Sequence, residues 1–229
     1  MKIYFIQHSS FLAETESALY LFDYFGGKLP IVNREKPLFV LASHSHDDHF
    51  STEVFEAVGN FHKVSFILSS DISKTKVPEL YQKQTVFVSP YQNISYEFGE
   101  IRTLQSTDLG VAFLIKEKDQ TIYHAGDLNS WVWQGASPYQ NEQMISLYQS
   151  EIQKLKGEKI DVAFMLLDPR QEENYALGMT LLLEEVNPKI VVPMHMWGDF
   201  SVVPKFKKEF PQYAERMLMV QKEGDFFEI

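Results

Sequence analysis

The stretch SHSHDDHF at 43–50 follows directly on the apolar run PLFVLAS, and it places three of the chain's seven histidines within six consecutive positions. If the extended geometry of the preceding strand persists, His44 and His46 point to the same side. The turn that follows can then bring Asp48 and His49 towards a second point nearby. Imidazole nitrogens and carboxylate oxygens are natural ligands of zinc, and they also suit manganese and iron. The stretch therefore predicts a metal site; the alternative is a polar surface loop in which histidines cluster by chance.

Two later segments show the same arrangement of a polar residue behind an apolar strand. Asp127 follows TIYHA in the segment YHAGDLN, and His195 follows KIVVP in VVPMHMW. A lone Asp or His in such a place is more often a cap or a satisfied core group. Because His44 occupies a strand end as well, we expect the three side chains to converge on one edge of a sheet.

Composition narrows the possible functions. The 229 residues are 45% hydrophobic and carry a formal net charge of −10, which disfavours binding to nucleic acids and to anionic membrane surfaces. The absence of cysteine excludes disulfides, thiolate zinc sites and cysteine nucleophiles. No signal peptide and no apolar run of ~20 residues is apparent, so a cytoplasmic protein is expected. The sequence does not indicate the oligomeric state.

Hydrophobic patterning predicts a single domain over 1–229 with strands early and strand–helix alternation late. Strands are expected at 2–8, 18–24, 37–43, 63–69, 84–89, 93–98, 100–106, 110–117, 120–125, 160–167 and 189–195. Helices are expected after Ser51 or Thr52 and at 138–156, 176–186 and 204–210. This order indicates two packed sheets with helices outside, a layered α/β sandwich rather than a barrel.

The pattern HxHxDH at 44–49, with GD at 126–127 and the late His195, resembles the metallo-β-lactamase-fold hydrolases. The opening segment QHSSFLAETESALYLFDYF resembles the first hairpin of the branch related to ascorbate-6-phosphate lactonases. The resemblance implies a four-layer αββα sandwich with two divalent metal ions at one edge between the sheets.

The resemblance also implies a role for each matched residue. His44 and His46 would hold the first metal, whereas Asp48, His49 and His195 would hold the second. Asp127 would bridge both ions, and Asp23 would brace the histidine-rich loop from behind.

The sequence departs from the family pattern at the third histidine of the first metal. Ser106 stands where that histidine is expected, and Asp108 could supply a carboxylate oxygen instead or only cap a turn. His124 lies three residues before Asp127 on the same strand, so it is expected to face the other way, as a residue that supports the ligands or belongs to the core. His8 could face the pocket mouth or be satisfied by backbone.

Further candidates for a substrate pocket follow the predicted bridging residue: Asn129, Trp131 and Trp133, together with Trp197 beside His195. Plain packing would explain these side chains equally well.

These features predict a hydrolase that uses a metal-bound hydroxide on a small-molecule ester, lactone, amide or phosphodiester. Asp48 and Asp127 are the expected catalytic residues, and zinc is the expected metal, with manganese or iron as alternatives. Two other functions stay open: a nuclease of the same fold, which the net charge of −10 disfavours, and a non-catalytic metal-binding sensor or scaffold with a degraded first site.

Overall fold

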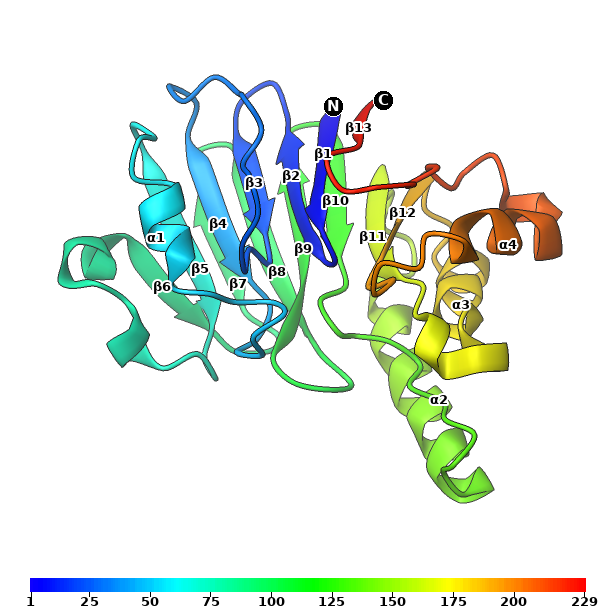
Figure 1. The fold of residues 1–229 in the computed structure, drawn as a ribbon. Coiled ribbons are helices and arrows are strands. Elements are labelled where there is room, and N and C mark those ends of the chain that lie inside the picture. The colour runs from blue at the N-terminus through cyan, green and yellow to red at the C-terminus, as the bar shows by residue number, and fades with distance from the viewer.

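Two mixed β-sheets pack face to face in the computed structural model, which describes residues 1–229 (Figure 1). The first sheet has the strand order β13-β1-β2-β3-β4-β5-β6 and the second has the order β12-β11-β10-β9-β8-β7. The strands of the first sheet are β1 (Lys2–Gln7), β2 (Ser10–Glu14), β3 (Leu19–Phe22), β4 (Leu38–Ala42), β5 (Val64–Ser69), β6 (Thr85–Val88) and β13 (Phe226–Glu228). Those of the second are β7 (Asn93–Tyr96), β8 (Gly99–Gln105), β9 (Val111–Glu117), β10 (Gln120–His124), β11 (Val162–Leu166) and β12 (Ile190–Met194).

Helices cover the outer faces of both sheets. The short helix α1 (Glu53–Ala57) lies over the first sheet, and α2 (Pro138–Ile152), α3 (Leu177–Glu185) and α4 (Val202–Glu209) lie beside the second (Figure 1). Short 3₁₀ segments connect these elements at Lys74–Lys76, Glu79–Gln84, Gln153–Leu155, Pro169–Asn174 and Pro211–Tyr213. A large apolar cluster fills the space between the sheets and beneath α2, α3 and α4, and a smaller one lies between the first sheet and α1. The predicted layered sandwich is confirmed.

The central strands of each sheet show why the fold forms. All five residues of β4 and all five of β11 are buried, and each strand lies between parallel neighbours. A strand that is covered on both faces needs a continuous apolar run, which LFVLA and VAFML supply. Pro193 is tolerated in β12 because this strand lies at the edge of its sheet.

Most predicted elements occur within a few residues of their expected bounds; the exceptions are β13, which was not among the expected strands, and two further elements. The strand β2 was not predicted, because the tight turn at His8 and Ser9 separates it from β1 by only two residues. Helix α4 begins at Val202 rather than at 204, so that Pro204 lies in its first turn, where a missing N–H costs nothing.

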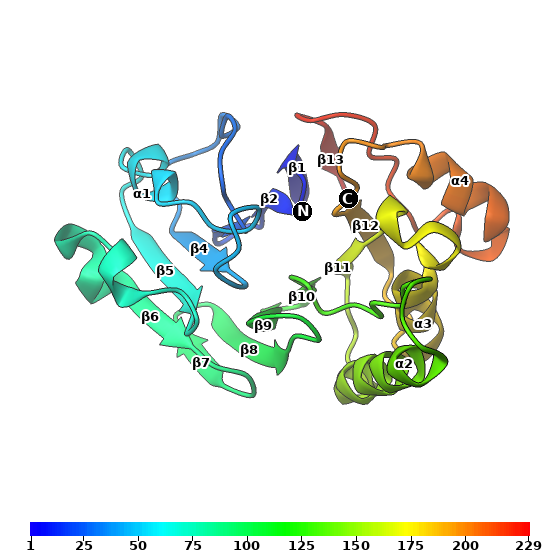
Figure 2. The ribbon, with the colours of Figure 1, turned by 60° about the horizontal axis from the view of Figure 1, so that its bottom comes forward.

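Strand direction gathers many chain segments at one edge of the sandwich. In the first sheet β1, β3 and β4 are mutually parallel, and in the second β8 runs parallel to β10, β11 and β12. The loops that follow these strands therefore meet at the lower edge in Figure 1, which comes forward in Figure 2. No helix combines the length and apolar character needed to cross a bilayer.

Candidate metal centre

Histidine and aspartate side chains gather where strands of both sheets end. Each member of the cluster lies in a loop that follows the carboxyl end of a strand, which is where α/β sheets commonly bind ligands. The members are His8 after β1, Asp23 after β3, His44, His46, Asp48 and His49 after β4, Asp108 after β8, Asp127 after β10, Asp168 after β11, and His195 after β12.

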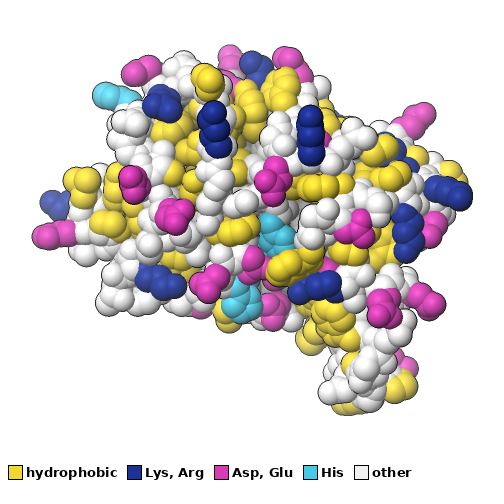
Figure 3. All heavy atoms as spheres, viewed as in Figure 1, with side chains coloured by type: hydrophobic (Ala, Val, Ile, Leu, Met, Phe, Trp, Pro, Cys, Tyr) yellow, Lys and Arg dark blue, Asp and Glu magenta, His cyan; other side chains and the backbone are white.

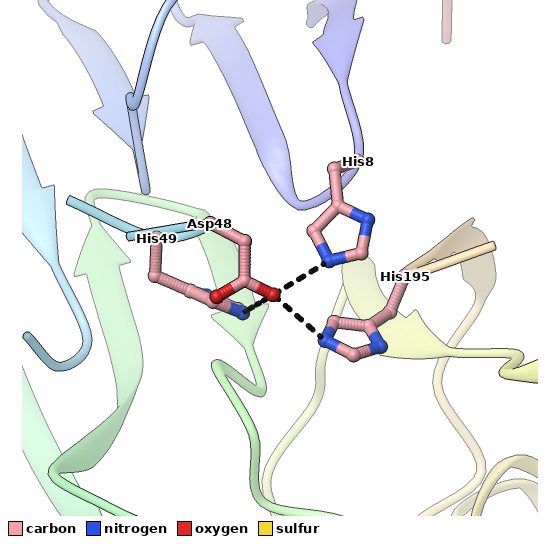
Figure 4. Close-up of side chains that lie close together, drawn as sticks. All are labelled: His8, Asp48, His49 and His195. Atoms are coloured by element: carbon pink, nitrogen blue, oxygen red, sulfur yellow. Dashed lines mark ion pairs between the residues drawn. The ribbon is translucent and has the colours of Figure 1, made fainter. Parts of the chain in front are cut away.

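One group consists of His8, Asp48, His49 and His195 (Figure 4). The Asp48 Oδ2 atom lies 3.3 Å from Nε2 of His8, 3.9 Å from Nε2 of His49 and 3.8 Å from Nε2 of His195. Figure 4 shows the three rings turned towards this carboxylate. His8, for which the sequence left open the pocket mouth or a position satisfied by backbone, lies within the cluster.

A second group consists of His44, His46, Asp108 and Asp127. The Nε2 atom of His44 lies 3.0 Å from Nδ1 of His46, and that Nδ1 atom lies 3.6 Å from Oδ2 of Asp108. Asp108 occupies the tight turn between β8 and β9, and this turn places its carboxylate beside His46.

Asp127 joins the two groups. Its Oδ1 atom lies 3.2 Å from Nε2 of His49 and 3.4 Å from Nε2 of His195, whereas its Oδ2 atom lies 3.6 Å from Nε2 of His44. Each carboxylate oxygen therefore faces a different group, which is the arrangement that a bridging ligand requires.

Buried carboxylates hold the far sides of the histidine rings. His49 Nδ1 donates to Asp23 Oδ2 at 2.8 Å, and His195 Nδ1 donates to Asp168 Oδ2 at 3.0 Å. Asp23 also accepts from the hydroxyl and the backbone N–H of Ser43, and the hydroxyl in turn lies 2.9 Å from His44 Nδ1. In the neutral rings these bonds place the proton on Nδ1, so that the Nε2 atoms of His49 and His195 can bind a metal.

The atoms that face one another fit a metal ion. His8 Nε2, His49 Nε2, His195 Nε2 and Asp127 Oδ1 are buried and have no hydrogen-bond partner in the protein, although buried polar atoms are normally paired. Tetrahedral ligands of a zinc ion, each ~2.0–2.1 Å from it, lie roughly 3.3 Å apart. The separations of 3.2 and 3.4 Å around Asp127 Oδ1 match this value.

Electrostatics favours the metal-binding forms of Asp127 and His44. Burial alone would raise the pKa of Asp127, but the charges of His49 and His195 outweigh it and hold that pKa well below its ordinary value. Burial, helped by the nearby His49, lowers the pKa of His44 to about 4. At neutral pH Asp127 is therefore a carboxylate and His44 a neutral imidazole, as metal binding demands. For His49, burial lowers the pKa, but Asp127 and Asp23 raise it well above its ordinary value, so that a metal ion displaces a proton there.

The backbone is strained around the site. Four of the eight non-glycine residues with positive φ belong to it: His8 (48°), Asp23 (43°), His195 (63°) and Trp197 (53°). Such conformations cost free energy and concentrate at functional sites. Gly126, directly before Asp127, also has a positive φ, and a Cβ there would approach Ser43 Cβ to 2.6 Å. Only glycine allows β10 and the histidine-rich loop to come this close.

Two predicted site residues face away from the metal ligands. His124 is buried; its Nε2 donates to the carbonyl of Ser9 and its Nδ1 accepts from Gly126, so neither nitrogen is free. Asn129 is also buried and donates to the side chain of Gln171. Both residues shape the loops that carry Asp127 instead of lining the pocket.

The open side of the cluster forms a hollow of about 390 Å³. Its walls include all three tryptophans of the chain, Trp131, Trp133 and Trp197, together with Met144 and Arg170. A second hollow of about 360 Å³, whose walls include three phenylalanines, shares Asp48 and Trp197 with the first. Figure 3 shows histidine and acidic side chains together on this face, with basic and hydrophobic ones beside them.

Sequence reasoning missed Asp168 and Arg170. A signal was available, because Asp168 follows the buried strand β11 just as Asp127 follows β10 and His195 follows β12. Pro169 was a second signal, because proline is common at the start of a helical turn. Asp168 caps this turn by accepting a hydrogen bond from the backbone N–H of Arg170.

Comparison with known proteins agrees with this architecture. Residues 2–132, more than half of the chain, match the family described as the beta-lactamase superfamily domain. A curated metal-dependent hydrolase from Desulforamulus reducens is 27% identical over 256 residues, covering 100% of each chain.

Solved structures show the same fold. A metallo hydrolase from Ignicoccus hospitalis has a TM-score of 0.65 at 18% identity, covering 100% of this chain and 98% of its own. CmlA, a diiron beta-hydroxylase from Streptomyces venezuelae, has a TM-score of 0.67 at 12% identity, covering 100% of this chain and 54% of its own. The chain thus belongs to the family of beta-lactamase superfamily domains and has the metallo-β-lactamase fold, and it is similar over its whole length to a protein described as a metal-dependent hydrolase.

Proposed function

We propose that the chain binds two divalent metal ions and hydrolyses a small-molecule ester, lactone, amide or phosphodiester. His44, His46, Asp108 and a share of Asp127 would hold the first ion. Asp48, His49, His195 and the other share of Asp127 would hold the second, with His8 close behind Asp48. Zinc is the proposed metal. Iron and manganese are the alternatives, because a first site with a carboxylate from Asp108 suits them better than a site of three imidazoles would.

The observation that carries this proposal is the position of Asp127. Its two oxygens face two separate groups of nitrogen and oxygen ligands, at 3.2–3.4 Å on one side and 3.6 Å on the other. A single structural ion would need only one of these groups. The buried, unpaired Nε2 atoms of His49 and His195 support the same conclusion for the second group.

A bound pair of divalent ions would supply a Lewis acid for the substrate's oxygen and water of lowered pKa as the nucleophile. The chain's own residues orient the reactants. Burial would raise the pKa of Asp48, but the adjacent His8 and the charge of His49 lower it, so that Asp48 is a carboxylate at neutral pH. Its side chain is 30% exposed towards both hollows and can accept a hydrogen bond from water there. The tryptophan walls would exclude bulk water from one side.

Elemental analysis and a substrate panel test the proposal together. Protein purified without chelator should contain about two metal ions per chain, and metal-loaded protein should hydrolyse at least one chromogenic ester, lactone or phosphodiester. Asp127→Asn serves as the inactive control. Tight binding of two ions without any turnover would favour a sensor or scaffold, and turnover only of oligonucleotides would favour a nuclease. Metal-free protein that gains no ion on loading would overturn the proposal.

A further inference from the structure

Arg170 is the only lysine or arginine among the eleven residues that line the hollow over the metal centre. Five of the others are the ligand candidates His46, Asp48, Asp108, Asp127 and His195, and three are tryptophans. A cation in this position requires an explanation, because the chain as a whole is acidic.

The guanidinium is held firmly along one edge. Its Nε atom lies 3.0 Å from both oxygens of Asp168, and its Nη2 atom lies 2.5 Å from Oδ2 of the same residue. Its Cζ atom lies 4.3 Å from the ring centroid of Trp197 and 6.0 Å from that of Trp133. Ion pairing and stacking thus fix the plane of the group.

The other edge of the guanidinium is available. An arginine side chain has five N–H donors, and Asp168 engages only those on Nε and Nη2. Nη1 has no hydrogen-bond partner in the protein, and the side chain is 45% exposed. If Arg170 served only to support Asp168, burial would strengthen the pair, yet the structure leaves half of the group open to the hollow.

The charge of the hollow also favours an anion once the proposed ions are bound. Arg170 balances Asp168, and two divalent ions carry four positive charges against the three carboxylates Asp48, Asp108 and Asp127. The loaded hollow therefore has a net positive charge, and its volume of about 390 Å³ suits a small molecule.

We propose that Arg170 forms an anion-binding subsite beside the metal centre, so that the substrate carries a carboxylate or phosphate group in addition to the bond that is cleaved. The proposal rests on the proposed function of this site. Trp131 and Trp133, stacked at 5.8 Å with an interplanar angle of 7°, form a flat wall for the apolar part of the same molecule. Because a guanidinium binds carboxylate and phosphate with charge-assisted hydrogen bonds, it would select anionic over neutral substrates.

Binding can be measured without turnover, because all three tryptophans of the chain line this hollow. Metal-loaded protein is titrated with benzoate, with inorganic phosphate and with neutral benzamide while tryptophan fluorescence is recorded. Arg170→Gln should weaken binding of the preferred anion about tenfold or more. Arg170→Lys should show a smaller loss, because it keeps the charge without the planar fork. Whichever of benzoate and phosphate binds more tightly identifies the anion.

Kinetics with matched substrates gives a second measure. Two esters with the same scissile bond are compared, one with a free carboxylate and one in which that carboxylate is replaced by a neutral carboxamide. The ratio of their kcat/KM values, which measures the preference for the anionic ester, should fall about tenfold in Arg170→Gln. Lys205→Met is the matched control, because Lys205 also stacks on an aromatic ring, that of Tyr175 at 4.0 Å, but lies outside the hollow. This variant should keep the wild-type preference.

Three outcomes would overturn the subsite. Anion binding that Arg170→Gln leaves unchanged would mean that anions bind the metals alone. An equal loss for anionic and neutral ligands would mean that Arg170 only shapes the pocket, and a loss of metal content would mean that it acts through Asp168 and His195. If the wild type binds anions through Arg170 but hydrolyses nothing, the subsite stands and the proposed function fails.

Discussion

The two ligand groups that meet at Asp127 differ in how firmly the protein holds them. In the group around Asp48, the side chains of His49 and His195 are 0% and 2% exposed, and a buried carboxylate fixes each ring from behind. In the other group only His44 and the shared Asp127 are buried. His46 and Asp108 are 50% and 46% exposed, and each contacts little besides the other ligands.

The difference indicates that one site is built before metal arrives, whereas the other is completed by it. A ligand with a fixed rotamer loses little conformational entropy on binding, but an exposed one must be ordered by the ion. We therefore expect a tightly bound second ion and a first ion that is easier to remove. The following experiments test whether the two sites differ in metal affinity, starting with the largest expected effect.

Asp127→Asn should abolish the difference, because it weakens both sites at once. A neutral amide attracts two cations far less than a carboxylate does, and its nitrogen cannot serve as a ligand. We expect at most one ion per chain by elemental analysis and no detectable hydrolysis, with the fold retained by circular dichroism. Two tightly bound ions in this variant would show that Asp127 does not bridge.

Replacing one histidine in each group should separate the two sites. His46→Ala should release the first ion and leave the second in place, at little cost in stability, because His46 is half exposed. His49→Ala should lose the second ion and also destabilise the metal-free fold by about 3 kcal/mol, because it removes a partner of the buried Asp23 carboxylate. Metal titrations and urea unfolding of both variants measure these effects, and equal losses of stability would contradict the comparison.

Asp168→Asn examines the support behind the firmer site without touching a proposed ligand. The hydrogen bond to His195 Nδ1 fixes the ring and its tautomer, and removing such a partner typically costs 10–100-fold in metal affinity. A competition titration against a chromogenic chelator would show this loss at one site only. An unchanged affinity would mean that the protein scaffold alone orients His195.

The fold could largely be predicted from the sequence because most of its strands coincide with apolar runs. LFVLA and VAFML are buried from end to end and predicted their strands well. The strand β2 was missed because SFLAE is short and its turn at His8 adopts a positive φ that no pattern signals. Local periodicity cannot reveal a conformation that only the surrounding structure enforces.

The candidate site was predictable where a histidine or aspartate follows an apolar strand directly in the sequence, as for His44, Asp127 and His195. Contacts between distant segments were not visible in this way. That His8 lies 3.3 Å from Asp48, and that Asp168 lies behind His195, depends on which strands are neighbours in two different sheets. The metal-binding roles of all these residues stay predictions until metal content is measured.

Substitutions of Asp108 should have the smallest effect, and they test which residue completes the less firmly held site. Its Oδ2 atom lies 3.6 Å from His46 Nδ1, and both burial and the nearby Asp127 raise the pKa of its carboxyl group. A bound cation would reverse that effect by stabilising the carboxylate. Asp108→Ala should therefore lower affinity for the first ion, roughly tenfold for a partly exposed ligand, and leave the second ion unchanged.

Asp108→His should shift metal preference towards zinc if the longer ring fits, because imidazole is a softer ligand than carboxylate. Titrations with zinc and with manganese distinguish these results, and an unchanged affinity in Asp108→Ala would leave this residue as part of the turn that its backbone N–H already forms with Ser106.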